Sequence, residues 1–477
     1  MGNPCDLSAV EARRLIGEKA LSPVELFDAC LARIEAVDPS LNAVVAKDVA
    51  VGRAQAQQAE KAVGDGTDLG LLHGLPVGVK DLENVAGLRT TFGSLLYEHN
   101  VSEADDAMVA NLRAAGAVLF AKTNTPEFGA GANTKNRVYG ATGNPFDPEK
   151  TCAGSSGGSA VALATGMMPL ATGSDYGGSL RTPAAFCGVV GFRPSPGLVP
   201  KVERGISLNP FGVLGPMART VDDVYLLLRA QADLNRRDPF SSADAHALSA
   251  KLEAADLGSL RLAWSVDLGC ATVASDVRAT FLDRLPLFRS AFQSSFERDP
   301  FDDSIHESFE VLRGVNFVGP FKELVENERD RLGPNVIDNT ERGLGYSLAD
   351  VAAAHVTQTR IFDDYLDLYQ DADILICPAA AVSPFPHANL SVTEIDGTPM
   401  PTYMRWLAPV YALTMGLPAV CVIPCGVDHS GMPFGIQVAG PKGSDMKVLA
   451  VAKSLEALLA GIEAGARPLP DLEALSS

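Results

Sequence analysis

Two glycine-serine turns, about 24 residues apart, constrain the fold of this chain more than any other feature. The first reads GSSGG over 154–158, and the second reads GSDYGGS over 173–179. An apolar run of helical length, Ala160–Met168, lies between them, and Met168–Thr172 predicts a short strand before the second turn. Glycine lets a backbone bend where a Cβ would clash, and it leaves N–H groups open to a ligand. A serine in such a turn can be a nucleophile, with an oxyanion held by neighbouring N–H groups.

A lysine upstream makes this pattern more specific than either turn alone. A single glycine-serine turn is more often a phosphate loop, a helix cap or a surface turn than a catalytic element. Lys80 ends a short apolar run in the turn-rich stretch GLPVGVKD over 74–81. A lysine at a strand end is usually a solvated charge, but two serine turns downstream make it a candidate catalytic base.

This set of residues resembles that of the amidase signature family, whose catalytic set is a lysine, a serine in a cis peptide and a nucleophilic serine. The resemblance implies that these are Lys80, Ser155 and Ser179, at the spacing of the family, with a cis peptide between Gly154 and Ser155. No cofactor and no metal belong to this set. The sequence therefore predicts a serine hydrolase that acts on amides.

The resemblance covers most of the chain, from about Leu7 to about Leu459. It is weakest between about Phe240 and Gly345. The first turn begins Cys152-Ala153-Gly154, where the family usually has two glycines. Since this departure leaves both serines in place, it does not change the expected roles.

The chemistry of these side chains suggests a mechanism. Lys80 can take a proton from serine only when neutral, so burial would have to lower its pKa from about 10.4. Asp81 need not pair with it, because neighbours on a strand point to opposite faces. Ser155 would relay the proton from Ser179 to Lys80, and Ser179 would form an acyl-enzyme. Ser155 would then protonate the leaving amine, and water would release the acid.

Further residues in and next to the two turns are expected to assist. Ser156 and Ser174 are expected to hydrogen-bond within their turns. Arg181, together with Asp175, is expected to anchor the second turn, the arginine by bonding a carboxylate or a carbonyl. Oxyanion stabilisation is expected from the backbone N–H groups of Tyr176, Gly177, Gly178 and Ser179.

A competing interpretation makes Ser156 the nucleophile, because GSSGG also fits the G-x-S-x-G elbow of α/β-hydrolases. That fold needs an acid and then a histidine after the serine. None of the later histidines lies in the final helical segment, although His429, in a loop, remains a candidate for the histidine that this fold requires. These histidines are His246, His306, His355, His387 and His429. A nucleotide-phosphate loop is disfavoured because the chain has no G-x-x-x-x-G-K-[ST] motif.

The composition limits the partners and the compartment. The 477 residues carry a formal net charge of −19, which repels phosphate backbones and argues against a nucleic-acid partner. The eight cysteines are scattered and are expected to be reduced and buried, without a zinc site. No apolar run is as long as a membrane span, and the N-terminus has no apolar stretch of signal-peptide length. We therefore expect a cytoplasmic protein without membrane contact; whether it forms a homo-oligomer is left open.

Alternating helical and strand patterns predict an α/β fold: a large, twisted, mixed sheet covered by helices on both faces, in a single amidase-type domain. Residues 1–65 are expected to be helices packed on the core, and 66–235 to be the signature core with the catalytic residues. Residues 236–345 are expected to be a variable region that shapes the pocket. Residues 346–477 are expected to complete the core.

Phenylalanines gather in the variable region, where residues 281–321 hold eight of the twenty. At helical spacing such residues are more often core, but some could line an apolar pocket. The sequence thus favours hydrolysis of a small-molecule amide with apolar or aromatic groups, with carbamates or esters as further substrates. A glutamine-hydrolysing, A-type component of a tRNA-dependent amidotransferase complex, which resembles the same family, is the alternative. A non-catalytic scaffold would not need all three catalytic positions.

Overall fold

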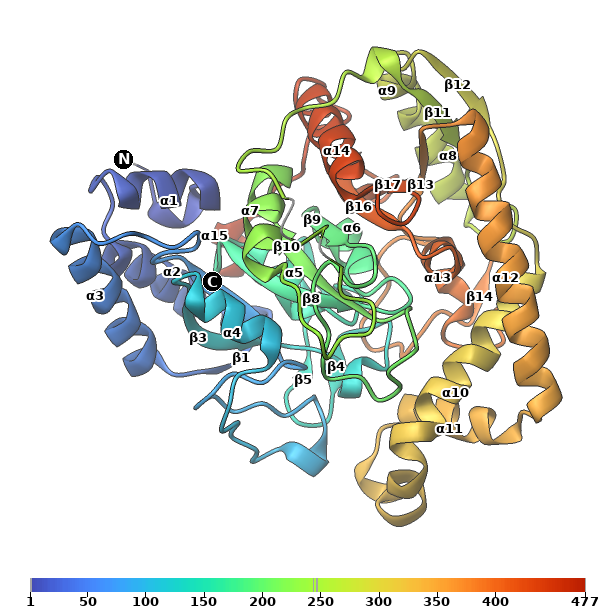
Figure 1. Ribbon diagram of the computed structural model, residues 1–477, viewed down its shortest axis with the longest axis horizontal. Helices are drawn as coiled ribbons and strands as arrows, with labels where there is room; N and C mark the ends of the chain where they lie inside the picture. Colours follow the sequence, from blue (N-terminus) through green and yellow to red (C-terminus); the bar gives the residue numbers. More distant parts are fainter. Residues whose placement is uncertain (1, 243, 246–247, 477) are drawn as a thin grey trace.

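A mixed sheet of eleven strands forms the centre of the protein (Figure 1). The computed structural model describes residues 2–242, 244–245 and 248–476. In spatial order the strands are β1 (Val44–Lys47), β3 (Val118–Thr123), β2 (Pro76–Lys80), β8 (Leu170–Asp175), β10 (Val213–Ala218), β9 (Val190–Arg193), β16 (Ala419–Val427), β17 (Pro433–Gly440), β13 (Ile374–Pro378), β11 (Arg261–Trp264) and β12 (Ser294–Glu297).

Helices pack on both faces of this sheet, which confirms the predicted fold class. In Figure 1, α7 lies in front of the strands and α5 lies behind them. The helices are α1 (Ala9–Gly17), α2 (Pro23–Val37), α3 (Val49–Asp65), α4 (Ala107–Ala114), α5 (Gly157–Ala164), α6 (Arg181–Cys187), α7 (Val221–Gln231), α8 (Ser275–Arg284), α9 (Pro286–Arg289), α10 (Ser304–Asn327), α11 (Pro334–Gly345), α12 (Leu348–Asp371), α13 (Ala408–Met415), α14 (Asp445–Ala460) and α15 (Leu472–Leu475).

Short strands outside the main sheet form three two-stranded pairs. They are β4 (Lys135–Asn136) with β5 (Gly140–Ala141), β6 (Gly143–Asn144) with β7 (Asp147–Thr151), and β14 (Glu394–Ile395) with β15 (Thr398–Pro399). Among the described residues, no helix is both long enough and apolar enough to cross a bilayer.

Parallel pairing in the middle of the sheet positions the predicted site. β2 pairs in parallel with both β3 and β8, so the carboxyl ends of β2 and β8 lie side by side. Both strands are buried along their whole length, as expected where helices cover both faces of parallel strands. Lys80 ends β2 and Asp175 ends β8, so both predicted residues emerge at one edge.

The two glycine-serine turns are shorter than the sequence predicts. α5 begins at Gly157, within the first turn, and β8 continues to Asp175, within the second. A Cβ on Gly157 would lie 2.6 Å from Cys152 Sγ, and one on Gly158 would collide with the backbone N of Asn124. These two glycines therefore allow close packing inside a helix, rather than a bend.

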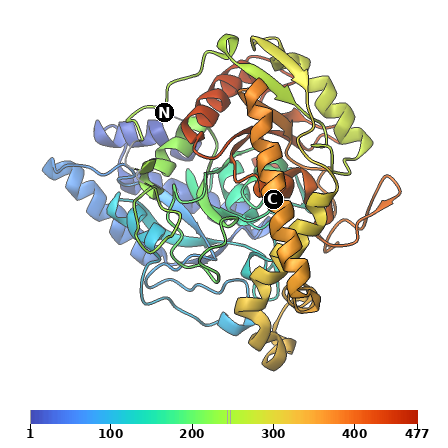
Figure 2. The ribbon, with the colours of Figure 1, turned by 45° about the vertical axis from the view of Figure 1, so that its right-hand side comes forward.

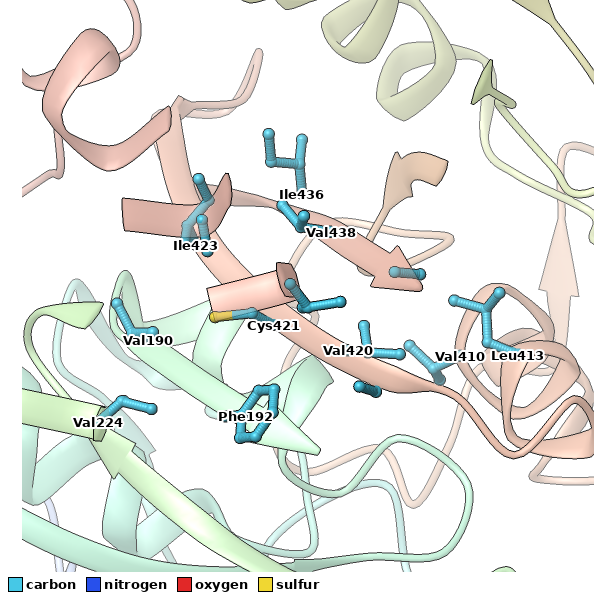
Figure 3. Packing of buried hydrophobic residues seen from close by; sticks show 14 of the residues in the cluster. Val190, Phe192, Val224, Val410, Leu413, Val420, Cys421, Ile423, Ile436 and Val438 are labelled. Atoms are coloured by element: carbon cyan, nitrogen blue, oxygen red, sulfur yellow. The ribbon is translucent and has the colours of Figure 1, made fainter. Parts of the chain in front are cut away.

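Buried apolar side chains form the core on both faces of the sheet, and Figure 3 shows the part of it around β9, β16 and β17. Strands β9, β16 and β17 contribute apolar side chains that pack with those of α7 and α13. Residues drawn in Figure 3 include Val190, Phe192, Val224, Val410, Leu413, Val420, Cys421, Ile423, Ile436 and Val438. All eight cysteines are buried, as expected, and none forms a disulfide in this structure.

Helices α10, α11 and α12 form a separate group at one end of the molecule, seen in yellow and orange in Figures 1 and 2. α10 packs against α11, α12 and α13. Most of the eight clustered phenylalanines are core, as the sequence favours: Phe281, Phe288, Phe292, Phe301, Phe309 and Phe317 are buried. The two at the end of this series, Phe317 and Phe321, also line a cavity.

Candidate active site

The structure brings the three predicted catalytic residues together at the edge where β2 and β8 end. Lys80 Nζ donates a hydrogen bond of 2.8 Å to Ser155 Oγ, which lies just before α5. Ser179 lies in the turn between β8 and α6 and lines the same cavity as Ser155. The backbone N–H of Ser156 donates to the carbonyl of Ser179 at 3.2 Å, which joins the two turns. The Gly154–Ser155 peptide is cis, as the resemblance implied.

Three serine hydroxyls surround the amine of Lys80. Besides Ser155, its Nζ contacts Ser156 Oγ at 2.9 Å and Ser174 Oγ at 2.9 Å. Ser156 and Ser174 were expected to bond within their turns, and instead both meet the lysine. An ammonium can donate to all three hydroxyls, whereas a neutral amine can donate to two and accept from one. These three hydroxyls, called the cage below, therefore provide hydrogen-bond partners for Lys80 Nζ in either protonation state.

Burial has the largest effect on the pKa of Lys80. Its side chain is fully buried, and this burial lowers the pKa of Lys80 to about 7 against an opposing attraction from Glu83. Asp81 points away, as expected for neighbours at a strand end. Its carboxylate accepts from Thr91 Oγ1 at 2.6 Å and lies 3.8 Å from Lys122 Nζ. The adjacent acid is therefore paired with a different lysine.

A buried ion network fixes the second turn. Arg181 donates to both carboxylate oxygens of Asp175, at 3.0 and 2.9 Å, and Arg193 donates to one of them at 3.1 Å. Burial by itself raises the pKa of Asp175, but the charges of Arg181 and Arg193 outweigh it and hold this pKa well below its usual range. Arg181 also donates to the carbonyl of Val410 at 2.6 Å. The expected contacts of Arg181, to a carboxylate and to a carbonyl, are both present.

Asp175 also narrows the set of predicted oxyanion donors. The N–H of Gly178 donates to Asp175 Oδ1 at 3.0 Å, so this hydrogen is already bound. Leu180 N–H donates to Asp175 Oδ2 in the same way. Within the described part of the chain, no protein acceptor meets the N–H groups of Tyr176, Gly177 and Ser179. These three N–H groups therefore remain available to an oxyanion. The sequence did not reveal that Asp175 would bind the fourth predicted donor, the N–H of Gly178.

A cavity of about 310 Å³ opens in front of the serines. One wall is aromatic: the ring of Phe321 lies 4.9 Å from that of Phe128 and 5.4 Å from that of Phe317, and Phe92 stacks on Phe128 at 6.4 Å. Phe92 and Phe128 both adopt positive φ, 54° and 49°, which bulky residues rarely do without support from their surroundings. Charged side chains line the cavity elsewhere: Glu83, Asp106, Lys201, Glu203 and Arg313.

The elbow interpretation gains no support from the positions of the histidines. No histidine is among the described residues that line the cavity. His306 is buried away from it, where its ring nitrogens contact the hydroxyl of Tyr411 and the carbonyl of Cys270. His246 lies outside the described residues. In the same described part of the chain, no three metal-ligating side chains cluster to form a candidate metal site.

Comparison with known proteins identifies the family of this chain. A family model described as Amidase matches residues 25–295 and 304–449. The chain belongs to the amidase signature family. It is 33% identical to an acylamidase of Rhodococcus erythropolis over 95% of both chains. It is also 31% identical to the A-type component of a glutamyl-tRNA(Gln) amidotransferase of Roseiflexus castenholzii, over 94% of this chain and 95% of the other.

Solved structures show the same amidase signature fold. A structure described as an amidase superposes with a TM-score of 0.83 at 28% identity, over 94% of this chain and 99% of the other. A bacterial aryl acylamidase superposes with a TM-score of 0.85 over 95% and 96% of the two chains, and at 24% identity it supports the fold alone. The predicted family is thus confirmed, and this amidase family member is a hydrolase of C–N bonds.

Proposed function

We propose that this protein is a free-standing amidohydrolase that cleaves carboxylic amides carrying an apolar or aromatic group, through an acyl-enzyme on Ser179. One observation carries the proposal. Ser155 and Ser179 open together onto a cavity with an aromatic wall, while a buried lysine contacts Ser155 from behind. A nucleophile, a proton path and an apolar pocket are what such a reaction requires.

The first half of the reaction forms the acyl-enzyme. Neutral Lys80 takes the proton of Ser155 while Ser155 takes that of Ser179, and Ser179 Oγ attacks the carbonyl carbon. The oxyanion accepts hydrogen bonds from the free N–H groups of Tyr176, Gly177 and Ser179. Removal of one such donor typically costs about 10²–10³-fold in rate, so this turn contributes a large share of catalysis.

The second half returns the protons. The ammonium of Lys80 reprotonates Ser155, which gives its proton to the leaving nitrogen as the C–N bond breaks. Water then attacks the acyl carbon while Ser155 and Lys80 take one of its protons. The bond between this carbon and Ser179 Oγ breaks, the same proton returns through Ser155 to Ser179, and the carboxylic acid leaves. Throughout, Asp175 with its two arginines holds the turn that carries Ser179.

Glutamine hydrolysis within an amidotransferase complex is the second candidate, favoured by several amidotransferase components that are 30–32% identical to this chain. The aromatic wall argues against it, because a glutamine side chain is short and polar and would leave four rings uncovered. Acylamidase-like activity fits this wall better, since aryl and acyl groups gain from contact with it.

A screen of the purified chain tests this function. Aliphatic amides, anilides, aryl carbamates, aryl esters and glutamine are supplied separately, and release of amine, ammonia or phenol is measured. We expect turnover of anilides or other aromatic amides by the chain alone, and little release of ammonia from glutamine. Turnover of glutamine only, or activity only after addition of a partner protein, would favour the amidotransferase role instead.

The aromatic wall leads to a separate prediction on substrate choice. We expect Phe321→Ala to raise KM for an aromatic amide about 10-fold, because the ring contacts with the substrate and with Phe128 are lost. KM for acetamide should change little, since so small a substrate does not reach the wall. Phe296→Ala is the matched control, because this ring is only partly buried and does not line the cavity. Equal effects on both amides would place the substrate elsewhere.

A further inference from the structure

Glu83 is a buried carboxyl in the wall of the active-site cavity, and the proposed mechanism does not use it. Only 4% of its surface is exposed. It follows Lys80 by three residues, and its N–H donates to the Lys80 carbonyl at 3.1 Å, so a tight turn after β2 folds the glutamate back toward the lysine. Its own carbonyl accepts a hydrogen bond from Lys122 Nζ. The main chain of Glu83 is thus held on both sides.

Thr172 of β8 connects this glutamate to the lysine. Its Oγ1 accepts a hydrogen bond of 2.9 Å from the backbone N–H of Lys80. The same hydroxyl donates to Glu83 Oε2, with 3.4 Å between the two oxygens. Thr172 and Ser174 are two residues apart on β8, so their side chains lie on the same face of this strand. One strand thus binds both the carboxyl of Glu83, through Thr172, and the amine of Lys80, through Ser174.

The charges around this pair give Glu83 a distinct position. The charged groups that face Lys80 are Glu83, Asp175 and Lys201. Asp175 is already paired with two arginines, whereas no described cation lies within 4 Å of the Glu83 carboxylate. Glu83 in turn faces Lys80, Lys122, Lys201 and Asp106. Burial raises the pKa of Glu83 to about 7 against the attraction of Lys80, so this carboxyl and the Lys80 amine exchange protons over the same pH range.

We propose that Glu83 is a positioning residue that sets the protonation state of Lys80, so that the active form of the enzyme depends on this pair and not on the lysine alone. The inference rests on the proposed role of neutral Lys80 as the base. A carboxylate beside Lys80 stabilises its ammonium form and so opposes the effect of burial, which favours the neutral amine. Loss of the carboxylate charge must therefore extend the range of neutral Lys80 to lower pH.

The test measures the rate at which a fluorophosphonate labels the protein as a function of pH, because this probe needs no knowledge of the substrate. In the wild type, the labelling rate should rise with pH as Lys80 loses its proton, and this rise is the acid limb of the pH profile. We expect Glu83→Gln to move this acid limb down by about one pH unit, as is typical when a nearby opposite charge is removed. Glu83→Asp keeps the charge but withdraws it by one methylene, so its limb should lie between the two.

Glu203→Gln is the matched control, since this carboxyl also lines the cavity but is not among the groups that act on Lys80. Its acid limb should coincide with that of the wild type. An acid limb that stays in place in both Glu83 variants, or moves up, would overturn the inference. If Lys80→Ala still labels with the wild-type limb, the proposed base itself is wrong, and this outcome is distinct. Should Glu83→Gln not fold, the Glu83→Asp limb alone decides, because it must lie below that of the wild type.

Discussion

Replacement of Ser179 by alanine is expected to lower kcat/KM for every amide and ester substrate by about 10⁴-fold or more, and to abolish labelling by a fluorophosphonate. The reason is that the hydroxyl of Ser179 supplies the atom that bonds to the acyl carbon. This residue is half-buried at the cavity, where a reagent can reach it. Peptide mapping of the labelled wild-type protein identifies the modified residue.

Ser156→Ala is the matched control for this experiment, because Ser156 is a fully buried serine on the same lysine. This variant should still be labelled at Ser179, at a reduced rate if the cage around Lys80 loosens. Thermal unfolding of both variants separates loss of chemistry from loss of fold. A label on Ser156 in the wild type would contradict the assignment and would revive the elbow interpretation.

Lys80→Ala and Ser155→Ala are expected to lose about 10²–10⁴-fold more activity on an anilide than on the p-nitrophenyl ester of the same acid. An amine leaves only when it is protonated, and these two residues are proposed to deliver that proton along their 2.8 Å contact. A phenolate leaves without such help. Because the acyl group is the same, the ratio of the two kcat/KM values reports on the leaving group alone.

Ser179→Ala provides the internal comparison, since it should lose both activities about equally. The proton-transfer roles of Ser155 and Lys80 are refuted if their variants lose both activities equally as well. Anilide hydrolysis by Lys80→Ala near the wild-type rate would require the whole serine–serine–lysine mechanism to be abandoned.

Local patterns predicted most of the elements and the arrangement of the site. At the start of α2, for example, serine at position 22 is followed by proline and, at the third position, by glutamate, a pattern typical of a helix start. In the structure Ser22 Oγ accepts from the N–H of Val24 and of Glu25, and Glu25 accepts from the N–H of Ser22, which completes the capping box. The three catalytic candidates could be chosen because the resemblance assigns each one by its spacing. Their convergence follows from parallel pairing of β2 with β8, which the chain order alone does not specify.

Contacts between segments were harder to predict. Ser174 was placed in a turn because glycine and serine favour turns, but β8 continues through it and directs its hydroxyl to Lys80. The spacing of Thr172 and Ser174, two residues apart, could have indicated that the strand continues with both hydroxyls on one face. It identifies Lys80 as the partner only when the neighbouring strand is known. In the same way, Gly178 has an N–H suited to an oxyanion, and only the folded turn shows that Asp175 binds it. Residue propensities describe the conformation of one segment, whereas the hydrogen-bond partners of Ser174 and Gly178 depend on how two segments pack together.

The origin of the aromatic wall has a consequence for how this enzyme can change over generations. Lys80, Ser155 and Ser179 all lie in the first part of the chain, whereas Phe317 and Phe321 come from α10, in the segment where the family resemblance is weakest. Mutations in α10 can therefore remodel the shape of the pocket while the proton path is inherited intact. The exceptions include Arg313 and Phe309 of α10, which contact the catalytic turn: the guanidinium of Arg313 lies 5.5 Å from the ring centre of Tyr176, and the ring of Phe309 lies 6.1 Å from it. A laboratory library that varies α10 but keeps Arg313 and Phe309 would sample new substrates at little risk to the reaction.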